Sequence, residues 1–245
     1  MNNEFFLQIP EVSNELIDKM NLNDPVKLLI YASLKTDIPN VYLFKKPIIQ
    51  PRLPFLFIIS GPSGSGKETS VANIEKEGIC KRIVSATTRK IRPNENPNDY
   101  FWMREKRANE TEKMYEENLI KEYELIESDM HHGEVYGLPK SSLNSINSEV
   151  SGIIHTENNG AKTLIKELGS KFNIVCIFVI AESYEILWER MKDRNNKVIR
   201  LEKSVEEIKD AKNIANYFLL NNSSIEDLQR SMQNLIRIYI KESKD

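Results

Sequence analysis

The stretch at residues 55–69 reads FLFIISGPSGSGKET, and it decides the fold of this chain. It starts with five apolar residues that include β-branched and aromatic side chains, between Pro54 and Gly61, which predicts a strand buried on both faces. The glycine-rich turn after it allows consecutive backbone N–H groups to converge on one anion, with a helix expected to follow. Lys67 adds a mobile ammonium group to this turn. The stretch therefore predicts a phosphate-binding loop between a strand and a helix.

We interpret this turn as the P-loop of a nucleoside-triphosphate-binding protein. The predicted ATP-binding residues in it are Gly61, Pro62, Ser63, Gly64, Ser65, Gly66, Lys67, Glu68 and Thr69. One position departs from the usual pattern, because Glu68 follows the lysine where a Ser or Thr normally helps to hold Mg²⁺. A carboxylate is a competent Mg²⁺ ligand. We therefore expect Glu68 to bind the metal, with Thr69 as the alternative ligand.

Strand and helix patterns alternate along the rest of the chain. Strands are predicted at residues 79–85, 152–155, 173–180 and 217–220, and helices at 69–77, 115–124, 161–168, 184–194 and 225–241. This alternation predicts an α/β fold of the P-loop NTPase type, with a mostly parallel sheet and helices on both faces. Residues 1–52 differ, since two short helices around residues 16–20 and 26–30 are followed by a proline-punctuated connector. We expect an N-terminal extension over 1–52 and the main domain over 53–245.

Composition excludes several classes of protein. The 245 residues carry a net charge of −2, so no global basic field would attract nucleic acid or an anionic membrane. The longest apolar runs, Phe55–Ile59 and Ile174–Ala181, fall far below the roughly 20 residues of a membrane helix. The N-terminus does not read as a signal peptide, and two cysteines are too few for a disulfide framework. We expect a cytoplasmic protein that binds small molecules, as a monomer or a homodimer.

A second anion-binding pattern lies at residues 85–100, which read SATTRKIRPNENPNDY. Arg89 and Arg92 offer two guanidinium groups three residues apart, with several hydroxyl groups and Tyr100 nearby. Arginine binds phosphate oxygens bidentately, and a phenol can add a hydrogen bond. The stretch suits a dianionic phosphate, although a solvated basic loop is the alternative.

With these residues in view, the chain resembles the guanylate kinase family, P-loop enzymes that move the γ-phosphate of ATP to GMP. The resemblance runs from about Phe55 to the C-terminus, and it implies an acceptor-binding insert at about residues 85–140. It also implies a glutamate that reads guanine nine residues before a Tyr-Gly pair, and Glu127 precedes Tyr136-Gly137 by that spacing. The implied GMP-binding residues are Ser85, Arg89, Arg92, Tyr100, Glu127, Tyr136 and Glu157.

The resemblance further implies a lid at about residues 188–203, which closes over the triphosphate. Arg190 and Arg194 are spaced to share one helical face, and Arg200 follows. Together with Lys67, these three arginines are the expected catalytic residues, because phosphoryl transfer needs positive charge around the γ-phosphate. Asn221 matches an asparagine close to adenine in the family, so we add it to the ATP-binding residues. The implied cofactors are ATP and Mg²⁺.

Three departures from the pattern of the guanylate kinase family leave other functions possible. Leu138 stands where the family usually has Ser or Thr, His155 replaces an acid, and the segment between Glu95 and Asp99 is one residue shorter than usual. The acid after Lys67 and the apolar Leu138 are also similar to ribose 1,5-bisphosphate phosphokinase. A guanylate-kinase-like binding module without catalysis is the third possibility. The paired arginines and Glu127 favour a nucleotide acceptor, GMP or dGMP.

Overall fold

The computed structural model describes residues 25–91, 95–131, 133–193 and 196–242, and its largest sheet has seven strands in the order β1-β2-β11-β10-β3-β9-β4. The strands are β1 (Leu34–Lys35), β2 (Val41–Leu43), β3 (Phe55–Ser60), β4 (Lys81–Arg82), β9 (Gly152–His155), β10 (Asn173–Ala181) and β11 (Tyr217–Asn221). From β11 to β4 all neighbours pair in parallel, whereas β2 adds antiparallel to β11 and β1 antiparallel to β2. The predicted α/β fold with a mostly parallel sheet is confirmed.

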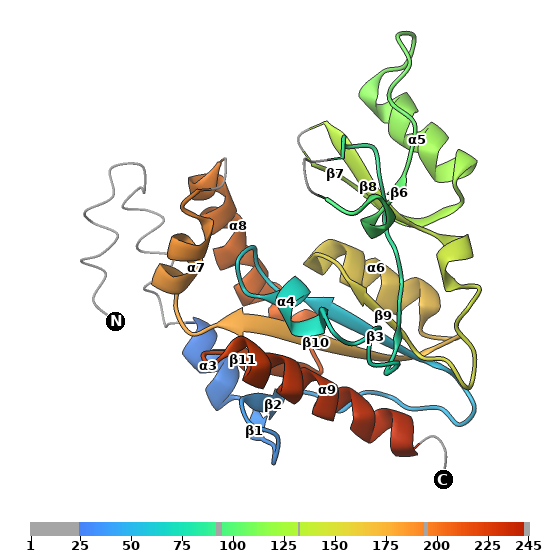
Figure 1. Ribbon diagram of the computed structural model, residues 1–245. Helices are drawn as coiled ribbons and strands as arrows, with labels where there is room; N and C mark the ends of the chain where they lie inside the picture. The colour runs from blue at the N-terminus through green and yellow to red at the C-terminus, as the bar shows by residue number, and fades with distance from the viewer. Residues whose placement is uncertain (1–24, 92–94, 132, 194–195, 243–245) are drawn as a thin grey trace.

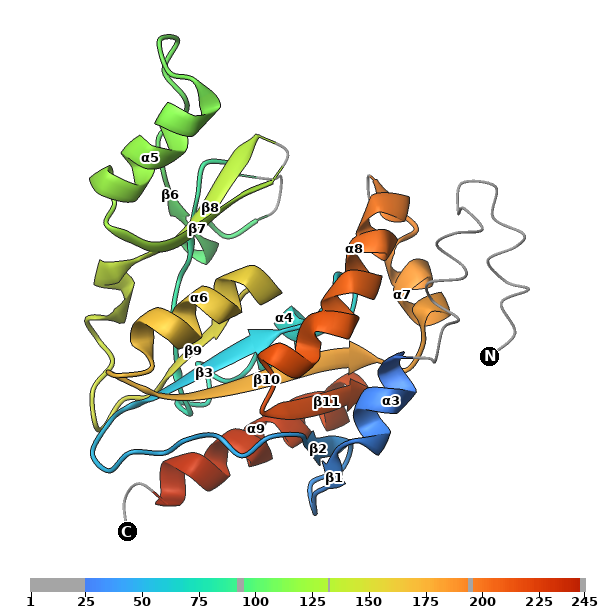
Figure 2. The same ribbon diagram turned by 180° about the vertical axis from the view of Figure 1, so that it is seen from behind.

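Helices cover both faces of this sheet (Figures 1 and 2). They are α3 (Pro25–Tyr31), α4 (Lys67–Val71), α6 (Asn158–Leu168), α7 (Tyr184–Met191), α8 (Lys197–Asp210) and α9 (Ile225–Glu242). Strand β3 is buried throughout, and its side chains alternate between two cores. Ile58 packs in the core that contains Leu164 of α6 and Leu201 of α8, whereas Phe57 packs in the core that contains Met232 of α9. The continuous apolar run of β3 follows from this burial on two sides.

A smaller unit is built on a second sheet in the order β6-β5-β8-β7. It consists of β5 (Ala86–Thr87), β6 (Phe101–Trp102), α5 (Glu112–Glu122), β7 (Leu125–His131) and β8 (Glu134–Pro139). Its own core includes Tyr115 and Leu119 of α5 packed with Val135 of β8. Both ribbon views show this unit and the α7–α8 pair projecting from the same side of the large sheet (Figures 1 and 2).

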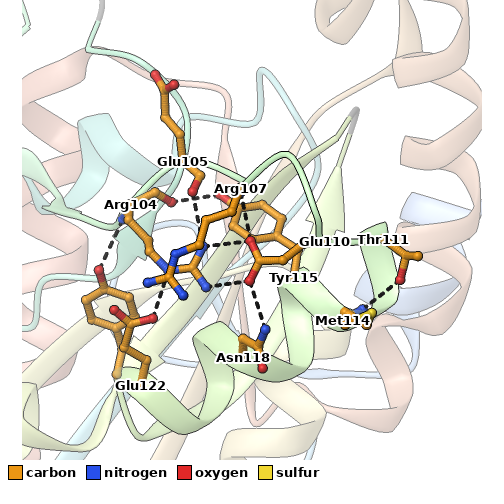
Figure 3. A network of polar contacts seen from close by, with 10 residues as sticks. Arg104, Glu105, Arg107, Glu110, Thr111, Met114, Tyr115, Asn118 and Glu122 are labelled. Atoms are coloured by element: carbon orange, nitrogen blue, oxygen red, sulfur yellow. Dashed lines mark hydrogen bonds and ion pairs between the residues drawn. The ribbon is translucent and has the colours of Figure 1, made fainter.

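A polar network ties the segment before α5 to that helix (Figure 3). The Arg104 guanidinium bonds both oxygens of Glu110, at 2.8 and 2.9 Å, and Nε of Arg104 contacts Glu122 at 2.8 Å. Glu110 also accepts from Asn118, and the Tyr115 hydroxyl donates to the carbonyl oxygen of Arg104. The Arg104 guanidinium, followed by the backbone N–H of Arg107 and the Asn118 amide, lowers the pKa of Glu110 to about 2. The network fixes the outer part of the smaller unit by charge-assisted hydrogen bonds.

Most predicted elements of the main domain are confirmed, with shifted ends. The strands at 152–155, 173–180 and 217–220 and the helices at 115–124, 161–168 and 225–241 are all present. Ser183 caps α7 by accepting from the N–H of Ile186, but the helix ends at Met191, earlier than predicted. Helix α4 is also shorter than predicted, because turn-type bonds to the residue three before, such as Ala72 to Thr69, replace the helical pattern. The strand predicted at 79–85 pairs only over β4.

The N-terminal part of the described chain joins the main sheet. Helix α3 confirms the helix expected around 26–30, and the helix expected around 16–20 lies outside the described residues. Strands β1 and β2 occupy part of the predicted connector. None of the helices in the described ranges is long and apolar enough to span a bilayer.

Candidate active site

A cleft of about 860 Å³ lies between the phosphate loop, the smaller unit and the α7–α8 pair. Most of the residues predicted from the sequence line it, namely Gly61, Ser63, Gly64, Gly66, Lys67, Glu68, Thr69, Ser85, Tyr100, Glu127, Tyr136, Glu157, Arg190, Arg200 and Asn221. Pro62, Ser65 and Arg89 belong to the surrounding structure instead. Arg92 and Arg194 lie outside the described residues. One cavity therefore brings together residues from both predicted anion-binding stretches.

The phosphate loop adopts a conformation that requires glycine. Gly61, Gly64 and Gly66 have φ angles of 142°, 81° and 99°, which side chains rarely allow. A Cβ atom at Gly61 would also lie 2.2 Å from the carbonyl oxygen of Val179 on β10. Lys67 folds back over the loop, with its Nζ 3.2 Å from the carbonyl oxygen of Pro62. This arrangement leaves the ammonium group beside the loop, inside the cleft.

Two arginines reach the phosphate loop from the α7–α8 pair. Nη1 of Arg190 donates to the carbonyl oxygen of Gly64 at 3.2 Å, and Nη1 of Arg200 lies 3.5 Å from the hydroxyl of Ser63. Burial lowers the pKa of Arg190, but a guanidinium stays charged at any physiological pH. Three cations, two from these helices and one from Lys67, thus surround the loop, which suits a triphosphate.

Aromatic side chains form the facing wall, on the smaller unit. The rings of Tyr100 and Tyr136 lie 6.3 Å apart, and both line the cleft. Arg89 stands behind them, with its Cζ atom 4.9 Å from the ring centre of Tyr100. Its guanidinium forms a bidentate ion pair with Glu95, a partner that the sequence did not indicate. Burial, followed by the nearby Glu68 carboxylate, raises the pKa of Tyr100, so the phenol keeps its proton for donation.

Carboxylates gather at the far end of the cleft. Glu127 lies on β7, and its Oε2 atom is 3.2 Å from the position that a Cβ atom would take at Gly160 of α6. Burial raises the pKa of Glu127 to about 7, and the neighbouring Asp129 and Glu157 add to this shift. Glu157 forms an ion pair with Lys203 of α8.

Sequence reasoning missed Asp129 and Lys203, which line the cleft beside predicted residues. Asp129 stands two positions after Glu127 on the same strand, a spacing that places both side chains on one face. Lys203 stands three positions after Arg200 on α8, which likewise gives a shared face. Leu138, in contrast, is fully buried in the main core, so it offers no group to the cleft.

The residues at the base of the cleft fit a divalent cation. Glu68 and Thr69 both line the cleft next to Lys67, and they supply hard oxygen ligands. Over the described ranges, no group of three or more His, Cys, Asp and Glu side chains is arranged around a common point. Mg²⁺ at nucleotide sites typically uses one or two protein carboxylates, with phosphate oxygens and water as the other ligands. This donor set therefore suits a metal that arrives with a nucleotide.

Comparisons with known proteins agree on one family. Residues 54–239 match the family profile described as guanylate kinase. The chain is 32% identical to a guanylate kinase of Mesomycoplasma hyopneumoniae (strain 7448) over 76% of this chain and 94% of that protein. It is 30% identical to a guanylate kinase of Wolbachia pipientis wMel over 76% of this chain and 90% of that protein.

A plant relative and a solved structure extend the comparison. Guanylate kinase 2, chloroplastic/mitochondrial, of Oryza sativa subsp. japonica is 28% identical over 78% of this chain and 66% of that protein. The fold matches the crystal structure of guanylate kinase from Anaplasma phagocytophilum with a TM-score of 0.57 at 22% identity, over 77% of this chain and 87% of that one. With its P-loop and cleft, the chain belongs to the guanylate kinase family of P-loop nucleoside monophosphate kinases.

Proposed function

We propose that this protein transfers the γ-phosphoryl group of ATP to GMP, giving ADP and GDP. The observation that carries the proposal is the single cleft, in which Lys67 and the arginines of α7 and α8 face Tyr100, Tyr136 and Glu127. The names of the bacterial relatives support the same reaction.

The triphosphate would bind in the loop from Gly61 to Thr69. Backbone N–H groups of the loop and the Lys67 ammonium would hold its phosphates, while Arg190 and Arg200 would stabilise the charge that develops during transfer. Arg194, outside the described residues, is proposed for the same task. Glu68, or Thr69, would hold Mg²⁺, which neutralises charge between the β- and γ-phosphates when bound. The protein's own contribution would be positioning and electrostatics, without a covalent intermediate.

The acceptor would bind across the cleft with its phosphate on the smaller unit. Ser85, Tyr100 and Tyr136 line the cleft there, and Arg89 and Arg92 would supply positive charge. At the carboxylate end, Glu127 would accept hydrogen bonds from N1–H and the exocyclic amine of guanine, a pair of donors that adenine lacks. Glu157 would lie beside the base. The same contacts apply to dGMP, which carries the same base and phosphate.

We further propose a domain organisation for the chain. Residues 53–245 would form the kinase domain, with the acceptor-binding insert at about 85–140 and the lid at about 188–203. Residues 1–52 would be an extension whose described part supplies α3 and adds β1 and β2 to the edge of the main sheet. We also propose that the protein acts in the cytoplasm on small nucleotides, as a monomer or a homodimer, and does not bind nucleic acid.

One observation favours a second acceptor. Leu138 follows Tyr136-Gly137 and is buried in the core, so this position offers no hydroxyl to a base carbonyl. A sugar-phosphate kinase related to ribose 1,5-bisphosphate phosphokinase would not need that hydroxyl. The carboxyl group of Glu127 weighs against this alternative, since a sugar phosphate has no paired N–H donors. A binding module without catalysis would not need the Lys67 ammonium.

A coupled assay that measures ADP release separates these acceptors. ATP would be offered with GMP, dGMP, AMP, UMP and ribose 1,5-bisphosphate, and kcat/KM compared. The proposal predicts that GMP and dGMP are the preferred acceptors. Preference for the sugar phosphate would support the second candidate, and no turnover with any acceptor would support a binding module.

A further inference from the structure

His155 is a polar side chain at the base of the cleft that the proposed reaction leaves without a task. It is the last residue of β9, which pairs in parallel with β3, and its Cα partner in that pair is Ile59. The next residue confirms this register, because the N–H of Thr156 donates to the carbonyl oxygen of Ile59 at 3.0 Å. Ile59 stands two residues before Gly61, so both strands end at the phosphate loop. The pairing therefore delivers the imidazole to the edge of the sheet where the loop begins.

The side chain of His155 is half-buried and lines the same cleft as Lys67, Glu68 and Thr69. It makes no hydrogen bond or ion pair to any residue in the described part of the chain. The charged groups around it are Glu68 of α4, Arg82 of β4, Lys67 of α4 and Asp99. An imidazole that faces a cleft beside these charged groups can bind a partner that enters the cleft.

The metal chemistry of the nearby residues indicates what that partner is. Glu68 stands in the first turn of α4 and offers a carboxylate, while His155 offers an imidazole nitrogen from the neighbouring strand end. Mg²⁺ takes oxygen ligands almost exclusively. The affinity of a site with a nitrogen ligand rises along the first-row transition ions from Mn²⁺ to Cu²⁺. A carboxylate and an imidazole beside a phosphate loop thus form a mixed oxygen–nitrogen donor pair. Phosphate oxygens and water would complete the coordination.

Resting on the proposed binding of a nucleoside triphosphate, we propose that His155 and Glu68 together bind the accompanying divalent cation, and that this pair favours Mn²⁺ or a later transition ion over Mg²⁺. The nitrogen ligand is the source of the preference. Replacing it with a carboxylate by His155→Asp removes the nitrogen but keeps a ligand. That variant is expected to prefer Mg²⁺ more strongly than the natural chain does.

Pulsed electron paramagnetic resonance of bound Mn²⁺ tests for the nitrogen directly. The protein would be enriched with 15N-histidine and given Mn²⁺ with inorganic triphosphate, a ligand that contains no nitrogen. The chain has three histidines, so any 15N coupling comes from one of them. We expect a 15N coupling in the natural chain that is lost in His155→Ala and in His155→Asn. The matched controls His131→Ala and His132→Ala should keep it.

Calorimetry of Mn²⁺ and Mg²⁺ binding at saturating triphosphate gives a second readout. The ratio of Mn²⁺ to Mg²⁺ affinity should fall by at least about tenfold in His155→Asp, since changes to groups that only support a ligand already cost that much. Glu68→Gln should weaken both ions. Circular dichroism would verify that each variant is folded.

The outcomes separate this inference from the proposed function. Mn²⁺ that binds with triphosphate but shows no 15N coupling overturns the role of His155 and leaves the kinase proposal standing. An unchanged affinity ratio in a folded His155→Asp variant overturns it as well. Failure of the natural chain to bind triphosphate at all contradicts both proposals.

Discussion

Nδ2 of Asn221 donates a 2.7 Å hydrogen bond to the carbonyl oxygen of Ser65, which joins the end of β11 to the phosphate loop. The same nitrogen lies only 2.3 Å from the position that a Cβ atom would take at Gly66. The loop is therefore shaped around this amide, and Gly66 is needed both for its φ angle and for the close approach. Asn221 acts on the loop itself, in addition to the place beside adenine that the family resemblance implies.

Removing this contact should loosen the loop. Asn221→Ala leaves a buried carbonyl without its donor, so we expect the free energy of unfolding to fall by about 1–3 kcal/mol and the KM for ATP to rise. Urea denaturation and steady-state kinetics measure the two effects. Asn222→Ala is the matched control, because Asn222 is exposed. If Asn221→Ala and Asn222→Ala had the same unfolding free energy and the same KM for ATP, the hydrogen bond from Asn221 to Ser65 would be unimportant for the loop.

Lys67 should be required for turnover but not for folding. Lys67 supplies the ammonium group of the loop, and its Nζ donates to the carbonyl oxygen of Pro62 within the same loop, so Lys67→Ala should reduce kcat by roughly 10²–10³-fold or more while the circular dichroism spectrum stays unchanged. Lys76→Ala, at an exposed position of the same segment, is the control. Near-normal rates in Lys67→Ala would refute the phosphate assignment.

Acceptor binding should depend on the ionisation of Glu127. Its pKa is raised to about 7, and only the carboxylate can accept both guanine donors. We therefore expect the dissociation constant for GMP to decrease as the pH rises through about 7, and Glu127→Gln to bind weakly at every pH. Fluorescence or calorimetric titration with GMP between pH 6 and pH 8 measures this. A pH-independent affinity in the natural chain would mean that Glu127 does not read the base.

The raised pKa of Glu127 also predicts that the free energy of unfolding decreases as the pH rises, although GMP binding improves over the same range. Because the folded state holds the Glu127 proton more tightly than the unfolded state, this contribution to stability is complete below the ordinary pKa of 4.5 and is lost as the pH rises to about 7. Relative to the natural chain, Glu127→Gln should gain up to about 3 kcal/mol in unfolding free energy between pH 5 and pH 8. Glu105→Gln, at an exposed site, should show no such gain.

Acid should weaken the smaller unit through Glu110. The Arg104 guanidinium lowers the pKa of Glu110 to about 2, so the stability from this group is present above the ordinary pKa of 4.5 and is lost as the pH falls toward about 2. We expect Glu110→Gln to unfold at a lower temperature at pH 7 and to show a weaker loss of stability in acid. Glu117→Gln, exposed on the same helix, should follow the natural chain. Parallel melting curves for all three proteins would contradict the role of the network in Figure 3.

The parts of the fold that were predictable have local causes. Strands β3 and β10 are buried on both faces, so their sequences are continuous apolar runs that mark them directly. Strands β1 and β2 have two and three residues, too few to show a period, and they exist because β11 offers an edge. Asn196, the N-cap residue before α8, has a left-handed conformation and makes no side-chain cap hydrogen bond, which leaves no start signal for the helix. Strand β7 carries polar residues that face the cleft, so it does not read as a half-buried strand.

The residues of the candidate site also differ in whether local sequence or tertiary packing determines their position. The phosphate loop is one contiguous segment whose glycines and lysine act through local backbone geometry, and the sequence alone was enough to find it. Lys203, Asp129 and the Glu95 partner of Arg89 acquire their places only through tertiary packing of α8, β7 and the loop after β5. The hydrogen bond from Asn221 to the carbonyl oxygen of Ser65 likewise exists only because β11 ends beside the loop. Such contacts join residues far apart in the chain, which single-sequence patterns do not encode.

Transfer of a labelled phosphoryl group tests the central proposal most directly. ATP radiolabelled in its γ-phosphate would be incubated with the protein and GMP, and the products separated by chromatography. The account predicts that the label moves into GDP in step with ADP formation, and that Lys67→Ala abolishes the transfer. Label that stays in ATP, or that appears as inorganic phosphate at the same rate with and without GMP, would contradict it.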